Sequence, residues 1–367
     1  MPDRMSKRAV LVQANQPVEI WQHPVSAAQA GEVVVRVLMS GVCGTDVHFW
    51  RGEVDLPGPM VLGHEGIGAV EDLGEGVTTD FAGAPLSIGD RIYWVPLSPC
   101  HRCHYCTVEK DLSLCENGMA ELFRAADRPP SACYSEYSWL PAGMPFYRIP
   151  DDTPSEAVIA FGCAMPTMLQ GIERLGGINI NQTVVVQGCG PVGLAAVLLA
   201  KLSGARQIIV IGAPERRLAM AARLGATDII NMEEVSTAEE RVQCVLDLTQ
   251  GRGAEVVIEA AGVVAAFGEG LKIVAKNGRY LVVGLWSAPG TVAIEPRYIN
   301  NNNLRIIGTA LYQPEHLYGA IQVAQKNHRE FPLAEAVTHR FSLEDSQKAL
   351  EAVARLETVK AVIIPGL

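Results

Sequence analysis

The sequence predicts an α/β protein in two parts, a strand-rich first part and a second part built on a parallel sheet. The first 160 residues contain short β-like runs such as Glu32–Met39, separated by glycine and proline, and their helix signals are weak. From about Pro154 onward, buried-strand runs alternate with alanine- and leucine-rich segments. This alternation is typical of a parallel sheet, because a crossover helix joins each strand to the next.

The length and composition are those of a folded protein. A chain of 367 residues corresponds to about two domains of roughly 150 residues each. Hydrophobic residues make up 49% and charged residues 19%, which excludes global disorder. The net charge of −10 would repel a phosphate backbone, so we expect no nucleic-acid partner.

The sequence also argues against a secretory or membrane location. The N-terminal segment lacks the apolar core that a secretory signal needs. The longest apolar run, residues 189–200, is broken by glycine and proline and is shorter than the roughly 18 residues that suggest a membrane span. We therefore expect a cytoplasmic protein with no membrane partner, whose 9 cysteines serve a metal or catalysis rather than disulfides.

The strands of the second part are short and mostly apolar. The predicted runs are Thr183–Gln187, Gln207–Ile211, Val256–Glu259 and Tyr280–Gly284. Near the C-terminus, helix-like residues 342–356 precede strand-like residues 359–364. Periodicity does not decide whether this tail extends the parallel sheet or returns to the first part.

A glycine motif lies between the first of these strands and the helical residues 194–203. It reads Gly188-Cys189-Gly190-Pro191-Val192-Gly193. The first glycine permits a tight turn, the second lets the backbone approach a pyrophosphate, and the third lets helix and strand pack closely. The order strand, glycine turn, helix favours a dinucleotide site, with the diphosphate at the helix N-terminus. The alternative is an ordinary turn between a strand and a helix.

The end of the second strand bears on the choice between NAD and NADP. An acidic residue that binds the adenosine ribose is expected there, but the chain has Gly212. Arg216 and Arg217 follow and could bind a 2′-phosphate, or they could simply face solvent at the start of a helix. Glu215 could supply the missing ribose contact instead. The sequence leaves both cofactors open.

Two groups of cysteines have the residue types of zinc sites. Four cysteines with the spacing C-x2-C-x2-C-x8-C suit a closed, structural zinc site with four thiolates, and they are Cys100, Cys103, Cys106 and Cys115. The interleaved His101 and His104 are then expected to be exposed loop residues. Cys43, His64 and Cys163 are dispersed along the chain, but two cysteines and a histidine are the ligand types of a catalytic zinc with an open position. By composition alone, each is more often an inert core cysteine or a histidine with satisfied hydrogen bonds.

Taken together, these motifs resemble the zinc-dependent medium-chain dehydrogenase/reductase superfamily, of the alcohol, sorbitol and threonine dehydrogenase type. The resemblance covers essentially the whole chain. It rests on residues 41–48 (GVCGTDVH), residues 63–66 (GHEG) with Gly68, the four-cysteine lobe, the glycine motif, and the tail 352–365 with Lys360. Within that superfamily the chain is most similar to a poorly assigned bacterial and archaeal subgroup of zinc alcohol dehydrogenases. It departs from the usual pattern in the eight-residue lobe spacing and in Gly212, where an aspartate is common.

The resemblance implies roles for individual residues. Cys43, His64 and Cys163 would bind a catalytic zinc, with Glu65 able to enter its coordination shell. Asp46 would orient His64, as metal-bound histidines usually require, and Thr45 and His48 would form a proton relay. The residues expected to contact the cofactor are Gly188, Gly190, Pro191, Val192, Gly193, Gly212, Arg217, Gly284, Leu285 and Lys360.

The resemblance also implies the fold and the reaction. A GroES-like, β-rich catalytic domain would span residues 1–160 and 311–367, and a Rossmann domain with a doubly wound parallel sheet would span residues 161–310. The expected function is a zinc-dependent oxidoreductase that moves a hydride between an alcohol and NAD or NADP, giving an aldehyde or ketone, in a homodimer or homotetramer. Aromatic and apolar residues at Phe49, Trp50, Leu285 and Trp286 hint at an apolar or cyclic secondary alcohol, although they could equally be packing residues.

Two other functions remain open from the sequence. One is a zinc-free, NADPH-dependent reductase of activated double bonds on the same fold, which would leave Cys43, His64 and Cys163 unexplained. The other is a catalytically silent nicotinamide-binding protein, because folds are reused for unrelated functions.

Overall fold

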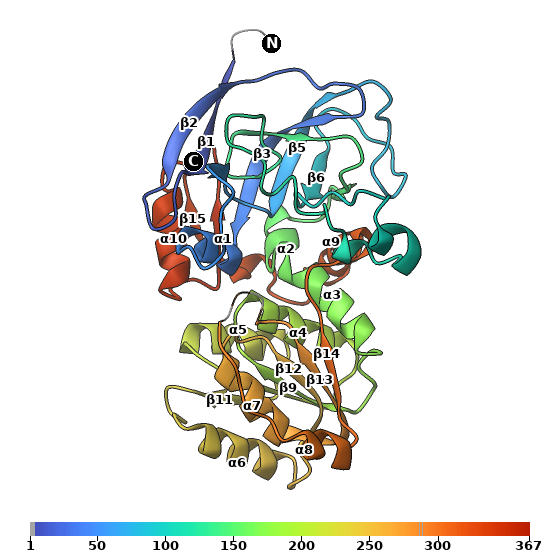
Figure 1. The fold of residues 1–367 in the computed structure, drawn as a ribbon, viewed down its shortest axis with the longest axis vertical. Coiled ribbons are helices and arrows are strands. Elements are labelled where there is room, and N and C mark those ends of the chain that lie inside the picture. Colours follow the sequence, from blue (N-terminus) through green and yellow to red (C-terminus); the bar gives the residue numbers. More distant parts are fainter. Residues whose placement is uncertain (1–3, 286, 288) are drawn as a thin grey trace. The chain divides into compact units, whose positions relative to one another are not determined.

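The computed structural model describes residues 4–285, 287 and 289–367. Contacts divide the chain into two compact units (Figure 1). Unit 1 comprises Met1–Cys163 and Tyr312–Leu367, and unit 2 comprises Ala164–Leu311. Unit 1 is rich in antiparallel strands and unit 2 is a parallel sheet with helices, so the predicted fold class is confirmed. Within the described ranges, no helix is long and apolar enough to cross a membrane.

Two sheets form the framework of unit 1. The smaller has the strand order β2 (Glu19–Pro24), β1 (Met5–Leu11), β4 (Met60–Val61). The larger has the order β15 (Val337–Phe341), β16 (Lys360–Ile363), β3 (Val33–Val42), β5 (Gly66–Leu73), β6 (Arg91–Trp94), β8 (Phe146–Arg148), and β7 (Tyr137–Leu140) also pairs with β3. Alternate residues of β3, β5 and β6 point into a core that includes Val35, Val70 and Trp94.

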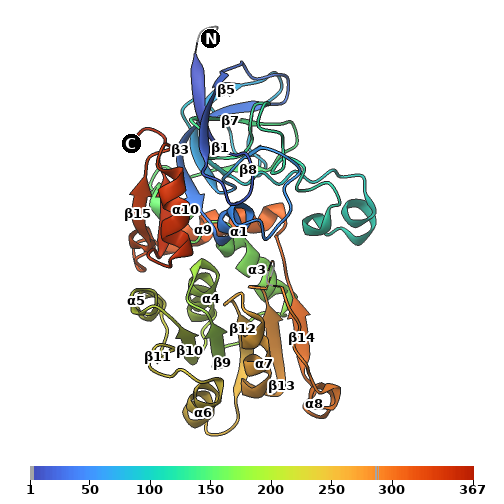
Figure 2. The same ribbon diagram turned by 60° about the vertical axis from the view of Figure 1, so that its left-hand side comes forward.

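The tail of the chain joins unit 1. Strand β16 runs antiparallel to β3, with Ala361 opposite Val42, and helix α10 (Ser346–Ala354) packs on it. Figure 2 shows α10 beside α1 (Gly44–Trp50). This pairing decides what periodicity had left open, and it agrees with the resemblance.

The helices of unit 1 are few and short in the N-terminal segment, as the weak signals predicted. They are α1, η1 (Tyr105–Glu109), η2 (Leu112–Leu114) and α2 (Ser155–Ile159), followed after unit 2 by α9 (Pro314–Asn327), η3 (Ala334–Ala336) and α10.

Unit 2 is a doubly wound parallel sheet. Its strand order is β11 (Asp228–Asn231), β10 (Gln207–Gly212), β9 (Thr183–Gln187), β12 (Ala254–Glu259), β13 (Val274–Val282), β14 (Arg305–Gly308). The helices are α3 (Ala164–Arg174), α4 (Pro191–Leu202), α5 (Glu215–Leu224), α6 (Ala238–Leu248), α7 (Val264–Ile273) and α8 (Pro296–Asn301). The predicted strands are all present, Thr183–Gln187 with the predicted bounds and the others with shifted ends. In particular, β13 begins before Tyr280 and stops before Gly284, which lies in a loop.

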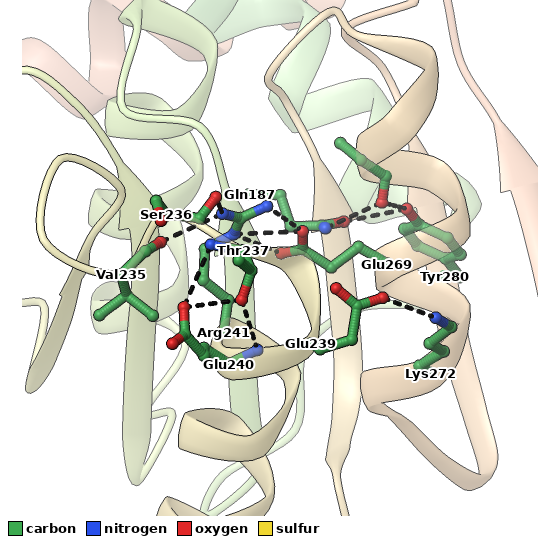
Figure 3. Close-up of polar contacts among 11 residues, drawn as sticks. Gln187, Val235, Ser236, Thr237, Glu239, Glu240, Arg241, Glu269, Lys272 and Tyr280 are labelled. Atoms are coloured by element: carbon green, nitrogen blue, oxygen red, sulfur yellow. Dashed lines mark hydrogen bonds and ion pairs between the residues drawn. The ribbon is translucent and has the colours of Figure 1, made fainter.

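Buried polar contacts join two helices of unit 2 to each other and two strands of its sheet to each other (Figure 3). The Arg241 guanidinium on α6 lies 2.7 Å from the Glu269 carboxylate on α7, and both side chains are buried. The Tyr280 hydroxyl donates to Gln187 Oε1 at 2.9 Å. Each group has a partner, so its burial does not leave an unsatisfied polar atom in the core.

Candidate functional site

Three residues predicted to bind metal come together in unit 1, although they are far apart in the sequence. Cys43 lies between β3 and α1, His64 precedes β5, and Cys163 follows α2. The Cys43 and Cys163 sulfur atoms are 3.6 Å apart. The possible ligand atoms of Cys43, His64, Glu65 and Cys163 all lie within 4.8 Å of one another. The fold therefore brings together residues whose sequence spacing gives no sign of a common site.

Asp46 organises this cluster through its carboxylate. Oδ2 accepts the Cys43 backbone N–H at 2.9 Å and the Tyr134 hydroxyl at 3.1 Å. Oδ1 accepts the Gly63 N–H at 3.3 Å and lies 3.3 Å from His64 Nδ1. An N–H bond from Nδ1 to Asp46 fixes the imidazole orientation and leaves Nε2 as the nitrogen for a metal.

Glu65 is held by a partner that the sequence did not reveal. Its carboxylate accepts the Cys163 backbone N–H at 2.8 Å and the Lys360 ammonium at 2.5 Å, and both side chains are almost fully buried. An added Cβ at Gly41 or Gly162 would lie about 2 Å from this carboxylate, so neither position has room for a side chain. Lys360 was predicted to contact the cofactor, and its observed partner in unit 1 is Glu65.

The pKa shifts within the cluster have opposite directions, and among its thiols only that of Cys43 is shifted toward the thiolate. The pKa of Cys43 is well below that of an ordinary thiol, first because Cys163 donates to it and then because His64 lies beside it, while the same bond raises the pKa of Cys163. Burial opposes ionisation of His64, but Asp46 raises its pKa well above the usual value. Tetrahedral zinc with Zn–S bonds of about 2.3 Å places two sulfurs about 3.8 Å apart. The 3.6 Å separation of Cys43 and Cys163 fits that geometry.

The four-cysteine lobe forms a second, separate cluster. Cys100, Cys103, Cys106 and Cys115 lie within 4.8 Å of one another. Cys103 Sγ is 3.5 Å from Cys106 Sγ and 4.0 Å from Cys115 Sγ, again close to the edges of a zinc tetrahedron. The Arg102 backbone N–H lowers the pKa of Cys100 to about 6, which favours the thiolate. The two interleaved histidines are exposed, as expected.

The predicted proton relay lies on α1. The Thr45 hydroxyl is 3.7 Å from Cys43 Sγ, and His48 follows one turn later with a partly exposed ring. His48 Nδ1 makes a short hydrogen bond to the Glu53 carboxylate, a contact that the sequence analysis missed. This bond orients the imidazole and directs Nε2 away from Glu53.

The predicted dinucleotide motif in unit 2 has the geometry that its glycines suggest. Gly188 follows β9 with φ of +106°, in the left-handed region that favours glycine. An added Cβ at Gly193 would lie 2.0 Å from the Gly188 carbonyl oxygen. Gly190 caps α4, and Pro191 and Val192 begin it. The helix N-terminus therefore offers its backbone N–H groups beside a turn in which Gly188 and Gly190 have no side chain, as a diphosphate site requires.

At the end of β10, the two arginines that could bind a 2′-phosphate or face solvent do not behave alike. An added Cβ at Gly212 would lie 2.6 Å from Cys189 Sγ, so the thiol fills the space where an acidic side chain would begin. Arg217 is buried, with a guanidinium nitrogen 3.8 Å from the ideal Cβ position of Gly190, and burial lowers its pKa. Of the two alternatives left open for these arginines, solvent exposure holds for Arg216 and not for Arg217. Glu215 is exposed and accepts a hydrogen bond from Asn231 at 3.4 Å.

The last predicted cofactor residues lie in the loop after β13. Gly284 donates its backbone N–H to the Glu259 carboxylate at 3.0 Å, and Leu285 is half-buried. Glu259 was not predicted from the sequence, although a carboxylate at the end of a buried strand indicates a residue with a specific hydrogen-bonding role.

The aromatic residues proposed for a substrate pocket have mixed outcomes. Phe49 is fully buried in a core cluster of unit 1, so it is a packing residue, and Trp50 packs partly against the same cluster. Trp286 lies outside the described residues. Nothing in the sequence singles out two buried tyrosines, Tyr93 and Tyr312. Burial raises the pKa of each, and their hydroxyls have no hydrogen-bond partner among the described residues.

Comparisons with known proteins agree with this geometry. Residues 29–151 match the family model of the alcohol dehydrogenase GroES-like domain, and residues 191–326 match that of the zinc-binding dehydrogenase. The chain is 46% identical to the 5-exo-hydroxycamphor dehydrogenase of Pseudomonas putida over 98% of both chains. It is 30% identical to the L-threonine 3-dehydrogenase of Bacillus subtilis over 93% of both chains.

Solved structures give the same result. An alcohol dehydrogenase from Thermotoga maritima superposes with a TM-score of 0.89 at 29% identity, over 98% of this chain and 99% of the other. A zinc-binding dehydrogenase from Sinorhizobium meliloti, solved with bound NADP, superposes with a TM-score of 0.85 at 25% identity, over 99% of this chain and 100% of the other.

Proposed function

The chain belongs to the zinc-dependent medium-chain alcohol dehydrogenase family, and from that premise we propose that it oxidises a cyclic secondary alcohol to the ketone. The broader activity, a zinc-dependent alcohol oxidoreductase that uses NAD(P), follows from the family. The narrower substrate class is supported by the 46% identity to a dehydrogenase named for hydroxycamphor, a cyclic alcohol. The cluster of Cys43, His64 and Cys163 is the observation on which the chemistry depends.

We assign Cys43, His64 and Cys163 as ligands of the catalytic zinc. Zinc bound there supplies Lewis acidity, which lowers the pKa of an alcohol hydroxyl. The Cys43 thiol loses its proton readily, because Cys163 donates a hydrogen bond to it. Asp46 holds the His64 imidazole in a fixed orientation. The Lys360 ammonium balances the charge of Glu65 behind the cluster. These contacts order the donor atoms before any metal binds.

Thr45 and His48 are assigned to proton transfer. The Thr45 hydroxyl lies beside Cys43, where it can accept a proton from a substrate hydroxyl while it releases its own proton toward His48. His48 is partly exposed on the same helix, and an imidazole can accept a proton and release it to solvent.

The two units have separate tasks in this proposal. Unit 1 is the catalytic domain with both zinc clusters, and unit 2 binds the dinucleotide at the glycine turn. We further propose a cytoplasmic homodimer or homotetramer whose partner is a small alcohol or ketone, with no nucleic-acid or membrane partner. The two thiolate clusters favour a reducing compartment. Light scattering of the purified chain tests the oligomeric state.

The decisive experiment is an alcohol panel measured with NAD and NADP separately. It should compare a bicyclic secondary alcohol with a monocyclic secondary alcohol, a linear secondary alcohol, a primary alcohol and a polyol. We expect the highest kcat/KM for a cyclic secondary alcohol, and loss of activity after zinc is removed by a chelator. A preference for polyols or primary alcohols would contradict the substrate class. NADPH-dependent reduction of an activated double bond by the zinc-free chain, with no turnover of any alcohol, would instead favour the zinc-free reductase.

A further inference from the structure

Glu259 is a buried carboxylate in unit 2 to which the proposed chemistry gives no role. It is the last residue of β12 and has no exposed surface. Strand β12 pairs with β9 on one side and β13 on the other. The chain leaves β9 toward β10 on the opposite side, so the sheet changes direction between β9 and β12. In open parallel sheets, ligands bind at the carboxyl ends of the strands at such a switch point.

The carboxylate joins two loops at this edge of the sheet. Oε1 accepts the backbone N–H groups of Ala261 and Gly262, both at 2.8 Å. Oε2 accepts the N–H of Gly284 at 3.0 Å, and the Glu259 carbonyl oxygen accepts the N–H of Val283 at 3.1 Å. One side chain therefore fixes the loop after β12 to the loop after β13.

These loops lie directly against the glycine turn. Ala260 donates its N–H to the Gln187 carbonyl at 2.8 Å. An added Cβ at Gly188 would lie 2.6 Å from the Ala260 carbonyl oxygen, and one at Gly284 would lie 2.6 Å from the Gly262 nitrogen. A displacement of either loop would therefore move the wall of the turn that is assigned to the diphosphate.

No cation accompanies Glu259 in the part of the chain that the structure describes. Burial raises its pKa, and hydrogen bonds from the Gly262, Ala261 and Gly284 N–H groups oppose that rise. An unpaired carboxylate is expensive to bury, and an apolar residue would avoid that cost but would leave the Ala261, Gly262 and Gly284 N–H groups without this acceptor. The Glu259 side chain therefore fixes the conformation of these two loops, whatever they bind.

We propose that Glu259 is a positioning residue for the dinucleotide, which holds the loops at 260–262 and 283–284 in their binding conformation before the cofactor arrives. The proposal rests on the assignment of unit 2 as the cofactor domain. An ordered loop loses less conformational freedom on binding than a mobile one, so the carboxylate raises cofactor affinity without touching the reacting atoms. It should act on NAD and NADP alike, because the loops lie away from Gly212, at the end of β10.

The test is Glu259→Gln, which keeps the shape but turns one oxygen into an N–H donor facing the backbone donors. Calorimetric titration with NAD, NADP and NADH should show Kd raised about ten- to hundredfold for all three, the range expected for lost hydrogen bonds to a charged group. Hydrogen exchange at the Ala261 and Gly284 amides should accelerate in the free protein. In turnover, the cofactor KM should rise while the alcohol KM at saturating cofactor stays at the wild-type value.

Arg279→Met is the matched control. Arg279 is also buried in unit 2, but it donates to Leu175 O, Gly177 O and Gln182 Oε1 at the amino end of β9, the opposite edge of the sheet. It should lower the melting temperature and leave Kd unchanged. Gly284→Ala is a second variant, for use if Glu259→Gln does not fold. It disturbs the contact between Gly284 and the Glu259 carboxylate from the side of the loop, and it should also weaken cofactor binding.

The outcomes separate this proposal from the proposed function. Wild-type affinity in both Glu259→Gln and Gly284→Ala would overturn the role of Glu259, as would an equal loss in Arg279→Met. A wild-type chain that binds no nicotinamide dinucleotide would overturn it too. If the wild type binds the dinucleotide but oxidises no alcohol, the proposed function fails while the affinity comparison still tests Glu259.

Discussion

Cofactor preference is the property that the end of β10 should control, and it can be changed by one charge. A carboxylate at position 212 would accept hydrogen bonds from the ribose diol of NAD and repel the 2′-phosphate of NADP. A single Gly212→Asp variant would not isolate that effect, because its Cβ would lie 2.6 Å from Cys189 Sγ. Removal of the thiol in Cys189→Ala leaves a closest contact of 3.1 Å, to Cys189 Cβ, which a small shift can relieve. The informative variant is therefore Cys189→Ala/Gly212→Asp.

The matched control is Cys189→Ala/Gly212→Asn, which has the same shape and strain but no charge. A hydrogen bond to a charged group contributes about 1.5–3 kcal/mol, which corresponds to roughly one to two decades in affinity. We expect the ratio of kcat/KM with NAD to kcat/KM with NADP to be higher by that factor in the Asp variant than in the Asn variant. Steady-state rates at saturating alcohol measure both ratios.

Arg217 gives the complementary test. Its buried guanidinium lies near Gly190, so it can pair with a phosphate at this edge of the sheet. Arg217→Met should weaken NADP more than NAD, by about a decade or more. Equal ratios in the Asp and Asn variants, together with no selective loss of NADP in Arg217→Met, would show that other residues set the preference.

Three further predictions concern unit 1. Cys43→Ser or His64→Ala should lower kcat by about a thousandfold or more, because Lewis-acid stabilisation is worth several kcal/mol, while calorimetry should show an unchanged Kd for the dinucleotide. Full activity in either variant would refute the ligand assignment. Elemental analysis should find about two zinc ions per chain, and Cys103→Ser should lose one of them and lower the melting temperature without stopping catalysis; the opposite pattern would exchange the two sites. His48→Ala should slow turnover by about tenfold, chiefly at low pH where solvent bases are scarce, and a pH profile identical to the wild type would remove His48 from the relay.

Local patterns predicted the parts of this protein that depend on neighbouring residues. The strand before Gly188, the glycine turn and the helix after it are continuous in sequence, and steric limits at Gly188 and Gly193 leave little choice of residue. The four-cysteine lobe is likewise confined to one loop. In both cases the residue spacing alone is enough to predict the kind of site, a dinucleotide turn in the first and a thiolate metal site in the second.

Contacts between distant residues could not be predicted from the residues alone. Glu65 and Lys360 are 295 positions apart, and their ion pair exists only because β16 returns to β3. Nothing in the periodicity of the tail specifies that return. Phe49 illustrates the same limit, because an aromatic residue beside a ligand motif can face a pocket or the core, and only packing shows that it lies in the core.

Glu65 and Glu259 show how two buried carboxylates in one chain can serve different ends. Glu65 has a cationic partner in Lys360, so its charge is neutralised beside the cysteine and histidine cluster. Glu259 is bonded to backbone N–H groups, which balance its charge only in part and hold two loops instead. Each carboxylate occupies space that glycines leave open, at Gly41 and Gly162 for the first and at Gly284 for the second. The glycines near these sites are therefore explained by the carboxylate that each must accommodate, as well as by the turns in which some of them lie.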